Sequence, residues 1–141
     1  MAEELFFKNK CFVIVGLCMK IHRTLSKGFK ESVFKDALEI ELKRENIPYD
    51  RERKFKIEYE DEILRHTFDA DFLVFQLIIL EIKAASLLPA DAFRQTLNYL
   101  KASHNKLALL INFGTYGSCF EELSAHYKIN LYSPYNITCV N

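Results

Sequence analysis

Two apolar runs between residues 71 and 83, Asp-Phe-Leu-Val-Phe-Gln-Leu-Ile-Ile-Leu-Glu-Ile-Lys, restrict the fold more than any other part of the sequence. Residues 77–82 are apolar at nearly every position, which is typical of a strand buried on both faces of a sheet. Glu81 and Lys83 are two residues apart in this strand, so their side chains share one face. A hairpin between the two runs places Asp71 opposite the end of the strand that carries Glu81 and Lys83. The sequence therefore predicts two carboxylates and an ammonium group gathered at one end of a strand pair.

Charges within such an apolar strand need partners, because burying an unpaired charge costs on the order of several kcal/mol. Asp71 and Glu81 supply hard oxygen ligands of the kind that Mg²⁺ prefers. A cation held next to a scissile phosphate lowers the pKa of its bound water and stabilises the leaving charge. The alternative is an ordinary Glu-x-Lys pair of strand-end charges. The apolar context favours a metal site.

The rest of the pattern predicts elements in the order α-α-β-β-β-α-β, followed by a less regular tail. Helices are predicted for residues 10–23, 30–45 and 89–102, the last with Pro89 as its first helical residue. Strands are predicted for residues 54–59, 63–75, 77–83 and 107–113, with an acidic turn at 60–62. In the tail, a short helix is predicted for 118–126 and a short strand for 129–132. Strands with helices before and after them predict an α/β domain with a central mixed sheet.

Composition sets the broad class of protein. A chain of 141 residues, half of them hydrophobic, suits one compact domain over residues 1–141. Residues 11–19 are too few to span a bilayer, and Glu3 and Glu4 stand where a signal peptide carries basic residues. Cys11 and Cys18 lack a metal-type spacing, and we expect them to pack as small apolar residues. These features predict a cytoplasmic protein without a membrane partner.

Charge gives a weaker indication of partners. The formal net charge is zero, which does not by itself indicate a nucleic-acid-binding protein. Basic residues nevertheless cluster at 20–30 and 51–56, while acidic residues concentrate at 39–45 and 58–62. This distribution is compatible with one basic face on a folded surface, although such charges are more often ordinary solvated ones.

Three further polar residues lie on predicted helices. Glu31 falls in the first turn of the second helix and shares a face with Phe34, which predicts that it leans inward. The alternative is an acid that stabilises a helix N-terminus. Gln95 and Tyr99 are four residues apart and share a face of the third helix. They either contact a substrate or form a half-buried polar pair at the margin of the helix.

Together these residues resemble the PD-(D/E)XK nuclease superfamily, and within it the bacterial GxxExxY family. The motif that names this family is present as Gly-Phe-Lys-Glu-Ser-Val-Phe at 28–34, with Phe34 in place of the usual Tyr. Other segments similar to the family, in its order, lie at residues 37–42, 70–74, 81–84, 95–102 and 110–114. The resemblance covers about residues 10–115 and leaves the tail, 116–141, without a counterpart. One departure is the hairpin dipeptide Phe75-Gln76, which lacks the usual Gly or Asn.

The resemblance implies a restriction-endonuclease-like fold and metal-dependent hydrolysis of phosphodiester bonds, most often in DNA. Asp71, Glu81 and the backbone carbonyl of Ile82 would bind Mg²⁺, for which Mn²⁺ is a substitute. Glu31 would add a carboxylate to the metal shell. Lys83 would position or activate the attacking water and stabilise negative charge in the transition state. This set predicts a small Mg²⁺-dependent DNase.

The resemblance also implies that Gln95 and Tyr99 contact substrate near the metal. Two other functions stay open at this point. The chain is alternatively a non-catalytic nucleic-acid-binding module, or an interaction protein that keeps the fold with an idle site. The small size leaves little surface for substrate selection, so a homodimer or a partner protein is a further expectation.

Overall fold

The computed structural model of the chain describes residues 2–105, 107–114, 119–124 and 138–140. Its helices are α1 (Ala2–Leu25), α2 (Glu31–Arg44) and α3 (Asp91–Ser103). Its strands are β1 (Tyr49–Tyr59), β2 (Glu62–Val74), β3 (Ile78–Lys83), β4 (Leu107–Asn112), β5 (Cys119–Ser124) and β6 (Thr138–Val140). The predicted α/β architecture with a central mixed sheet is confirmed.

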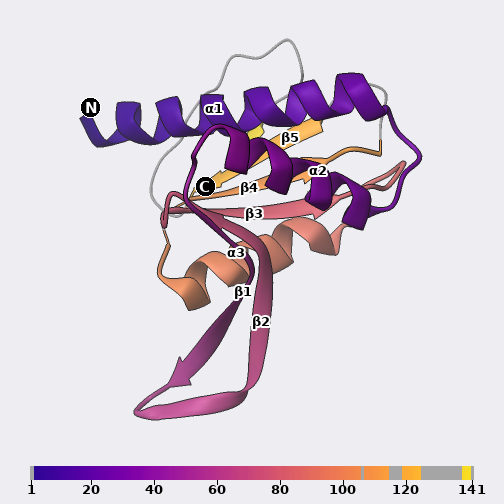
Figure 1. Cartoon of the computed structure of the whole chain (residues 1–141). Coiled ribbons are helices and arrows are strands. Elements are labelled where there is room, and N and C mark those ends of the chain that lie inside the picture. Colours follow the sequence, from indigo (N-terminus) through magenta and orange to yellow (C-terminus); the bar gives the residue numbers. More distant parts are fainter. Residues whose placement is uncertain (1, 106, 115–118, 125–137, 141) are drawn as a thin grey trace.

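The described strands form one sheet in the order β1-β2-β3-β4-β5-β6 (Figure 1). β2 pairs antiparallel with β1 and with β3, and β4 pairs parallel with β3 and antiparallel with β5. The parallel pair β3–β4 is joined through α3, because two parallel strands need a crossover connection. This arrangement places the C-terminal end of β3 in the middle of the sheet.

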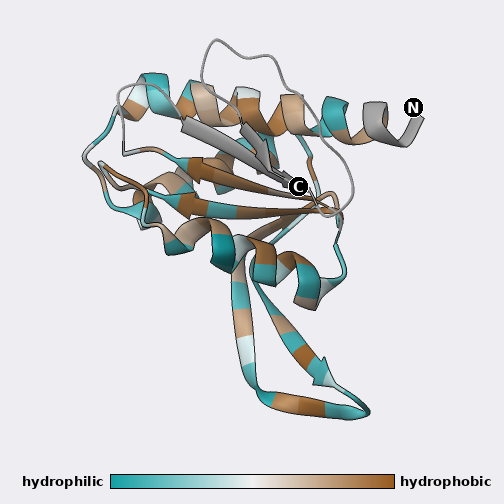
Figure 2. Cartoon of the chain, turned by 180° about the vertical axis from the view of Figure 1, so that it is seen from behind, coloured by the Kyte–Doolittle hydropathy of each residue, from teal (hydrophilic) through white to brown (hydrophobic). Residues whose placement is uncertain are grey.

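Helices cover both faces of this sheet. α1 and α2 lie on one face, and α3 lies on the other (Figure 1). Leu80 and Ile82 of β3 pack into the core under α1 and α2, whereas Ile79 packs into a smaller cluster under α3. Figure 2 shows β3 and β4 as mostly hydrophobic strands. The prediction that this apolar run is a strand buried on both faces is confirmed.

α1 is longer than the predicted helix at 10–23 and begins at Ala2. Cys11 and Cys18 are buried in the core as predicted, and burial raises the pKa of the Cys18 thiol well above its usual range. No helix within the described residues has the length and apolar character needed to cross a membrane.

β1 begins at Tyr49, five residues before the predicted strand at 54–59. The segment 49–53 lacks apolar alternation, but its backbone pairs with β2 from Tyr49↔Val74 onward. Beyond the body of the domain the two strands continue as a projecting hairpin (Figures 1 and 2), called here the arm, residues 53–68. Tyr59 pairs with Glu62 at its tip, so the turn is shorter than predicted.

The β2–β3 connection forms a tight turn without glycine. Phe75 and Gln76 both have positive φ, 58° and 57°, and the Leu77 N–H donates to the Val74 carbonyl at 3.1 Å. Positive φ at both central residues is the requirement of a type I′ hairpin turn. The hairpin thus forms although neither residue is the Gly or Asn that such turns favour.

Two further predicted elements differ from the structure. α3 begins at Asp91 with Ala90 as its N-cap, so Pro89 precedes the helix instead of opening it. The predicted helix at 118–126 is wrong, because β5 occupies Cys119–Ser124. β5 hydrogen-bonds to the edge of β4 that β3 leaves open, and this pairing outweighs local helical preference. The predicted strand at 129–132 lies outside the described residues.

Candidate active site

Asp71 and Glu81 lie where the ladder between β2 and β3 ends. Phe72 pairs with Leu80, so the same register places Asp71 opposite Glu81 at the next position. There, side-chain oxygens accept the backbone hydrogen bonds. The Asp71 N–H donates to Glu81 Oε1 at 3.3 Å, and the Ile82 N–H donates to Asp71 Oδ2 at 2.7 Å. The backbone of each strand therefore orients the carboxylate of the other.

The Glu81 carboxyl group is buried, with 6% of the residue exposed. Burial first, and then the negative charge of Asp71, raise the pKa of Glu81 to about 8, against the opposing effects of the Asp71 N–H hydrogen bond and of nearby Lys83 and Lys35. Among the described residues, only the Asp71 N–H donates a hydrogen bond to this group, which leaves Oε2 without one. A buried carboxylate with a spare oxygen beside a second carboxylate attracts either a proton or a cation.

Lys35 of α2 reaches this pair, although its sequence position did not single it out. Its Nζ donates to Asp71 Oδ1 at 3.0 Å and forms a second salt bridge with Glu52. Desolvation lowers the pKa of Lys35, but the hydrogen bonds and charges of Glu52 and Asp71 outweigh it and raise the pKa overall. The sequence offers one indication of this role: Lys35 lies one helical turn after Glu31 and next to the buried Phe34.

Glu52 is the second residue that sequence reasoning missed. The register of β1 and β2, with Arg51↔Phe72 and Arg53↔Ala70, places Glu52 across from Asp71. Glu52 has φ of 55°, in the left-handed region, which is uncommon for a non-glycine residue within a strand. Glu52, Asp71 and Glu81 thus follow one another across three neighbouring strands. In the part of the chain that the structure describes, no three acidic, His or Cys side chains converge closely enough to form a metal-binding group.

Lys83 lies two residues after Glu81 on β3 and therefore on the same face of the sheet. Its side chain is half-buried and, within the described structure, makes no salt bridge. Its positive charge is near enough to lower the pKa of Glu81. Lys83 thus presents an ammonium group beside the two carboxylates that is not committed to either.

The segment after β4 fixes the end of β3. The Phe113 N–H donates to the Lys83 carbonyl at 2.8 Å. The buried Asn112 side chain accepts from the Ala85 N–H at 3.0 Å and donates to the Ala85 carbonyl at 2.9 Å. A Cβ on Gly114 would lie 2.3 Å from the Ala85 backbone, so only glycine fits there. Residues 110–114, singled out in the sequence, therefore hold the strand end that carries Lys83.

Tyr99 of α3 lies near the carboxylates. It is half-buried and stacks on Phe68, with ring centroids 4.3 Å apart and parallel planes. Desolvation raises the pKa of Tyr99, and the negative charges of Glu81, Asp71 and Asp69 add to the effect. Gln95, one turn earlier, is exposed, and among the described residues it makes no hydrogen bond to this group. The structure brings Tyr99 to the site and leaves Gln95 at its margin.

Glu31 is exposed, so the prediction that it leans inward is wrong. The first turn of α2, Glu31 and Ser32, is solvent-exposed, and close packing of this helix begins at Phe34. Within the described structure Glu31 forms no hydrogen bond or salt bridge with Asp71 or Glu81. Lys35, one turn further on, is the side chain of α2 that reaches β2.

The donor set fits a hard divalent cation. Asp71 and Glu81 both offer carboxylate oxygens, and Glu81 Oε2 is buried without a hydrogen-bond donor from the described residues. Oxygen ligands of this kind suit Mg²⁺ and Mn²⁺, and Mg²⁺ keeps several waters when few protein ligands are present.

Comparison with known proteins bears on the family and the fold of the chain. The family model of the PD-(D/E)XK nuclease superfamily matches residues 8–123. The crystal structure of SSO0001 is similar in fold, with a TM-score of 0.52 and 20% sequence identity over 67% of this chain. This chain spans about half of that protein, 50% of its length. The comparison with curated proteins gave no match. With its restriction-endonuclease-like fold and a family match over most of its length, the chain belongs to the PD-(D/E)XK nuclease superfamily.

Proposed function

We propose that this protein is a metal-dependent nuclease that hydrolyses phosphodiester bonds in DNA. The observation that carries the proposal is the buried Glu81 carboxyl facing Asp71, with the uncommitted ammonium of Lys83 on the same strand face. Membership of a nuclease superfamily supports the reaction class. The finer assignment to the GxxExxY family rests on the residues at 28–34.

In this proposal Asp71, Glu81 and the carbonyl of Ile82 hold Mg²⁺ or Mn²⁺. The cation, when bound, supplies Lewis-acid stabilisation and a more acidic water. Lys83 positions the attacking water and stabilises the negative charge that develops on the phosphate. Glu31, being exposed, would reach the metal shell only through a bridging water.

The substrate strand would pass over α3. Tyr99 lies beside the carboxylates and is suited to a contact near the scissile phosphate. Gln95, exposed one turn earlier on the same helix, would contact the strand further from the metal. Both roles follow from the position of α3 against the sheet at the end of β2.

A second candidate is a nucleic-acid-binding module that keeps the fold without cleaving. The salt bridge between Lys35 and Asp71 favours it, because Lys35 already neutralises one of the two carboxylates. The two candidates make different predictions in the presence of a divalent metal.

The test is a cleavage assay on labelled single- and double-stranded DNA and RNA with Mg²⁺, Mn²⁺ or EDTA. Wild type is compared with Lys83→Ala and with Lys43→Ala, a matched lysine on the exposed side of α2. Metal-dependent cleavage by wild type and Lys43→Ala, and none by Lys83→Ala, is the expected result. Cleavage that survives Lys83→Ala, or salt-sensitive binding without any cleavage, would overturn the nuclease assignment.

We also propose that residues 1–141 act as one domain in the cytoplasm, without a membrane partner. A homodimer or a partner protein would extend the surface that recognises the substrate. Mass measurement in solution, with and without DNA, tests whether the chain forms a homodimer.

A further inference from the structure

A groove of about 480 Å³ lies between the base of the arm and α3. Phe68 and Tyr99 supply aromatic walls, and Ile57 and Ala102 supply aliphatic ones. His66, Thr67 and Asn98 add polar groups, and Asp69 adds one carboxylate. The groove therefore combines apolar and polar walls in equal parts, a composition suited to a flat, partly polar ligand.

The aromatic wall is part of a longer stack. Phe55 lies on Phe68 with ring centroids 5.1 Å apart, and Phe68 lies on Tyr99 at 4.3 Å. Arg53 sits over the Phe55 ring at 5.7 Å. All three rings are half-buried, so they retain exposed surface. Aromatic rings combined with guanidinium groups are the surfaces on which unpaired bases stack.

The groove adjoins the candidate active site, because Asp69 of its lining lies two residues before Asp71 on β2. Tyr99 lines the groove and also feels the charges of Glu81 and Asp71, which raise its pKa after desolvation. A nucleotide seated against Tyr99 would therefore have its backbone next to the two carboxylates. This position would allow groove and carboxylates to act on one and the same strand.

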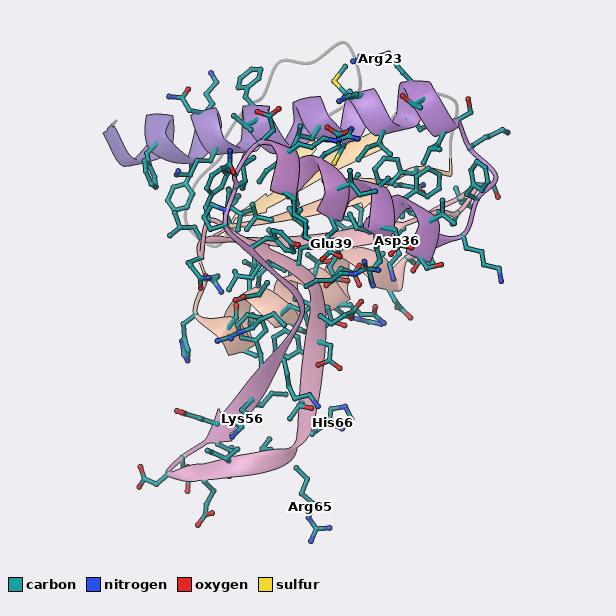
Figure 3. All side chains as sticks on the ribbon, in the orientation of Figure 1. Arg23, Asp36, Glu39, Lys56, Arg65 and His66 are labelled. Atoms are coloured by element: carbon teal, nitrogen blue, oxygen red, sulfur yellow. The ribbon has the colours of Figure 1, made fainter. Side chains whose placement is uncertain are left out.

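The arm carries a set of cations beyond the groove. Lys54, Lys56 and Arg65 are exposed, and within the described part of the chain none of them forms a salt bridge. Figure 3 shows Lys56, Arg65 and His66 spread along the arm, far from Arg23 on α1. Exposed cations spaced along an extended hairpin suit the phosphates of a nucleic-acid strand.

We propose that this groove binds one unpaired nucleotide, and that the arm guides the single strand that carries it past Asp71 and Glu81. Phe55 and Tyr99 cover the two faces of the Phe68 ring, so the exposed ring surface that Tyr99 retains is the surface for a base. The occupant is unpaired because a base can stack there only when it is free of its complementary strand. Asn98 and His66 supply hydrogen-bonding groups for the edge of that base. The proposal rests on the proposed nuclease function for the place of cleavage, but not for binding.

The test measures binding of the full chain to labelled oligonucleotides in EDTA, where no metal-dependent cleavage occurs. Single-stranded DNA, single-stranded RNA and duplex DNA of equal length are compared. Asn98→Asp introduces a negative charge into the groove, and His66→Ala removes a polar group. Asn9→Asp makes the same chemical change on an exposed position of α1, away from the groove. Far-UV circular dichroism checks that the variants fold alike.

We expect single strands to bind more tightly than duplex, with Asn98→Asp weakening single-strand binding about tenfold and Asn9→Asp leaving it unchanged. Whichever of single-stranded DNA and single-stranded RNA binds more tightly is the ligand of the groove. Equal single-strand binding by Asn98→Asp and wild type, or tighter binding of duplex, would overturn the proposal that the groove binds an unpaired nucleotide, even if wild type cleaves DNA. Groove-dependent binding without cleavage in Mg²⁺ or Mn²⁺ would instead overturn the nuclease and leave the groove supported.

Discussion

The Glu81 carboxyl group couples folding to pH. Its pKa rises from 4.5 to about 8 on folding, first through burial and then through the charge of Asp71. Folding thus favours the protonated form, so its stabilising contribution is full below about pH 4.5 and is lost as pH rises through 8. A divalent cation would relieve the same cost above that pH.

We predict that Glu81→Gln removes this dependence, because the amide is neutral at every pH. In EDTA the variant should be more stable than wild type at about pH 8.5, by an amount on the order of a few kcal/mol, and the two should converge near pH 5. Urea unfolding at several pH values measures the difference, with the exposed Glu45→Gln as control. Parallel stability curves for Glu81→Gln and wild type would contradict the raised pKa.

Lys35 supplies a positive charge next to Asp71, as a bound metal ion would. Its Nζ is 3.0 Å from Asp71 Oδ1 and is also salt-bridged to Glu52. An ammonium so close to a carboxylate both stabilises the metal-free fold and repels an incoming cation. Lys35 is therefore expected to oppose metal binding while supporting folding.

We predict that Lys35→Met binds Mn²⁺ more tightly, on the order of tenfold, because the competing ammonium is gone. The same change should lower the metal-free unfolding free energy by about 1–3 kcal/mol, since Asp71 loses its partner. Calorimetric titration with Mn²⁺ and urea unfolding in EDTA measure the two effects. Lys43→Met is the matched control. Weaker Mn²⁺ binding by Lys35→Met would mean that Lys35 orients Asp71 for the metal.

At the residue scale, the sequence alone predicts those residues of the candidate site that lie on strands. Asp71, Glu81 and Lys83 could be proposed together because alternation and a hairpin fix which side chains share a face. Lys35 could not, because its approach to Asp71 depends on how α2 is rotated and placed over the sheet. The same placement leaves Glu31 exposed, although both residues follow one helical period.

Among the elements, the loop after β4 carries a specific packing requirement. Gly114 meets the Ala85 backbone where a Cβ would be 2.3 Å away, and Asn112 bonds to both backbone groups of Ala85. In the same loop the Phe113 N–H donates a hydrogen bond to the Lys83 carbonyl. Any widening here would displace the end of β3.

We predict that Gly114→Ala destabilises the protein by about 2 kcal/mol or more, because backbone atoms rather than a flexible side chain must move. Gly16→Ala is the matched control. A Cβ at Gly16 meets nothing within 4 Å, and the change inside α1 should stabilise by about 0.5–1 kcal/mol. Thermal unfolding of both variants measures the pair. Equal stability of the two variants would show that the loop after β4 moves away from Ala85 at little cost in free energy.

The predictability of the elements follows the strength of their local pattern. β3 and β4 could be predicted because burial on both faces leaves continuous apolar runs. The start of β1 could not, because residues 49–53 gain their strand structure by pairing with β2. β5 was predicted as a helix for the same reason, since its hydrogen-bond partner lies on β4.

For the whole molecule, the uneven placement of charge matters more than the formal net charge of zero. The arm extends Lys54, Lys56 and Arg65 away from the body, with acidic residues mainly at its tip. The sequence gathers basic residues at 51–56 but does not show that they project from the domain. Only the fold turns that cluster into a surface along which a strand can lie.

This arrangement predicts the salt dependence of single-strand binding. Each phosphate contact releases counterions, and for single strands the slope of log K against log salt changes by about 0.7 per contact. Replacing Lys54, Lys56 and Arg65 by Gln should therefore make the slope shallower by about 2. The control removes three cations from the α1 and α2 side, Lys8, Arg23 and Lys43, and so matches the change in net charge. Binding measured in EDTA at several salt concentrations compares the two triple variants. An equal change in slope for both would show that overall charge, rather than the arm, attracts the strand.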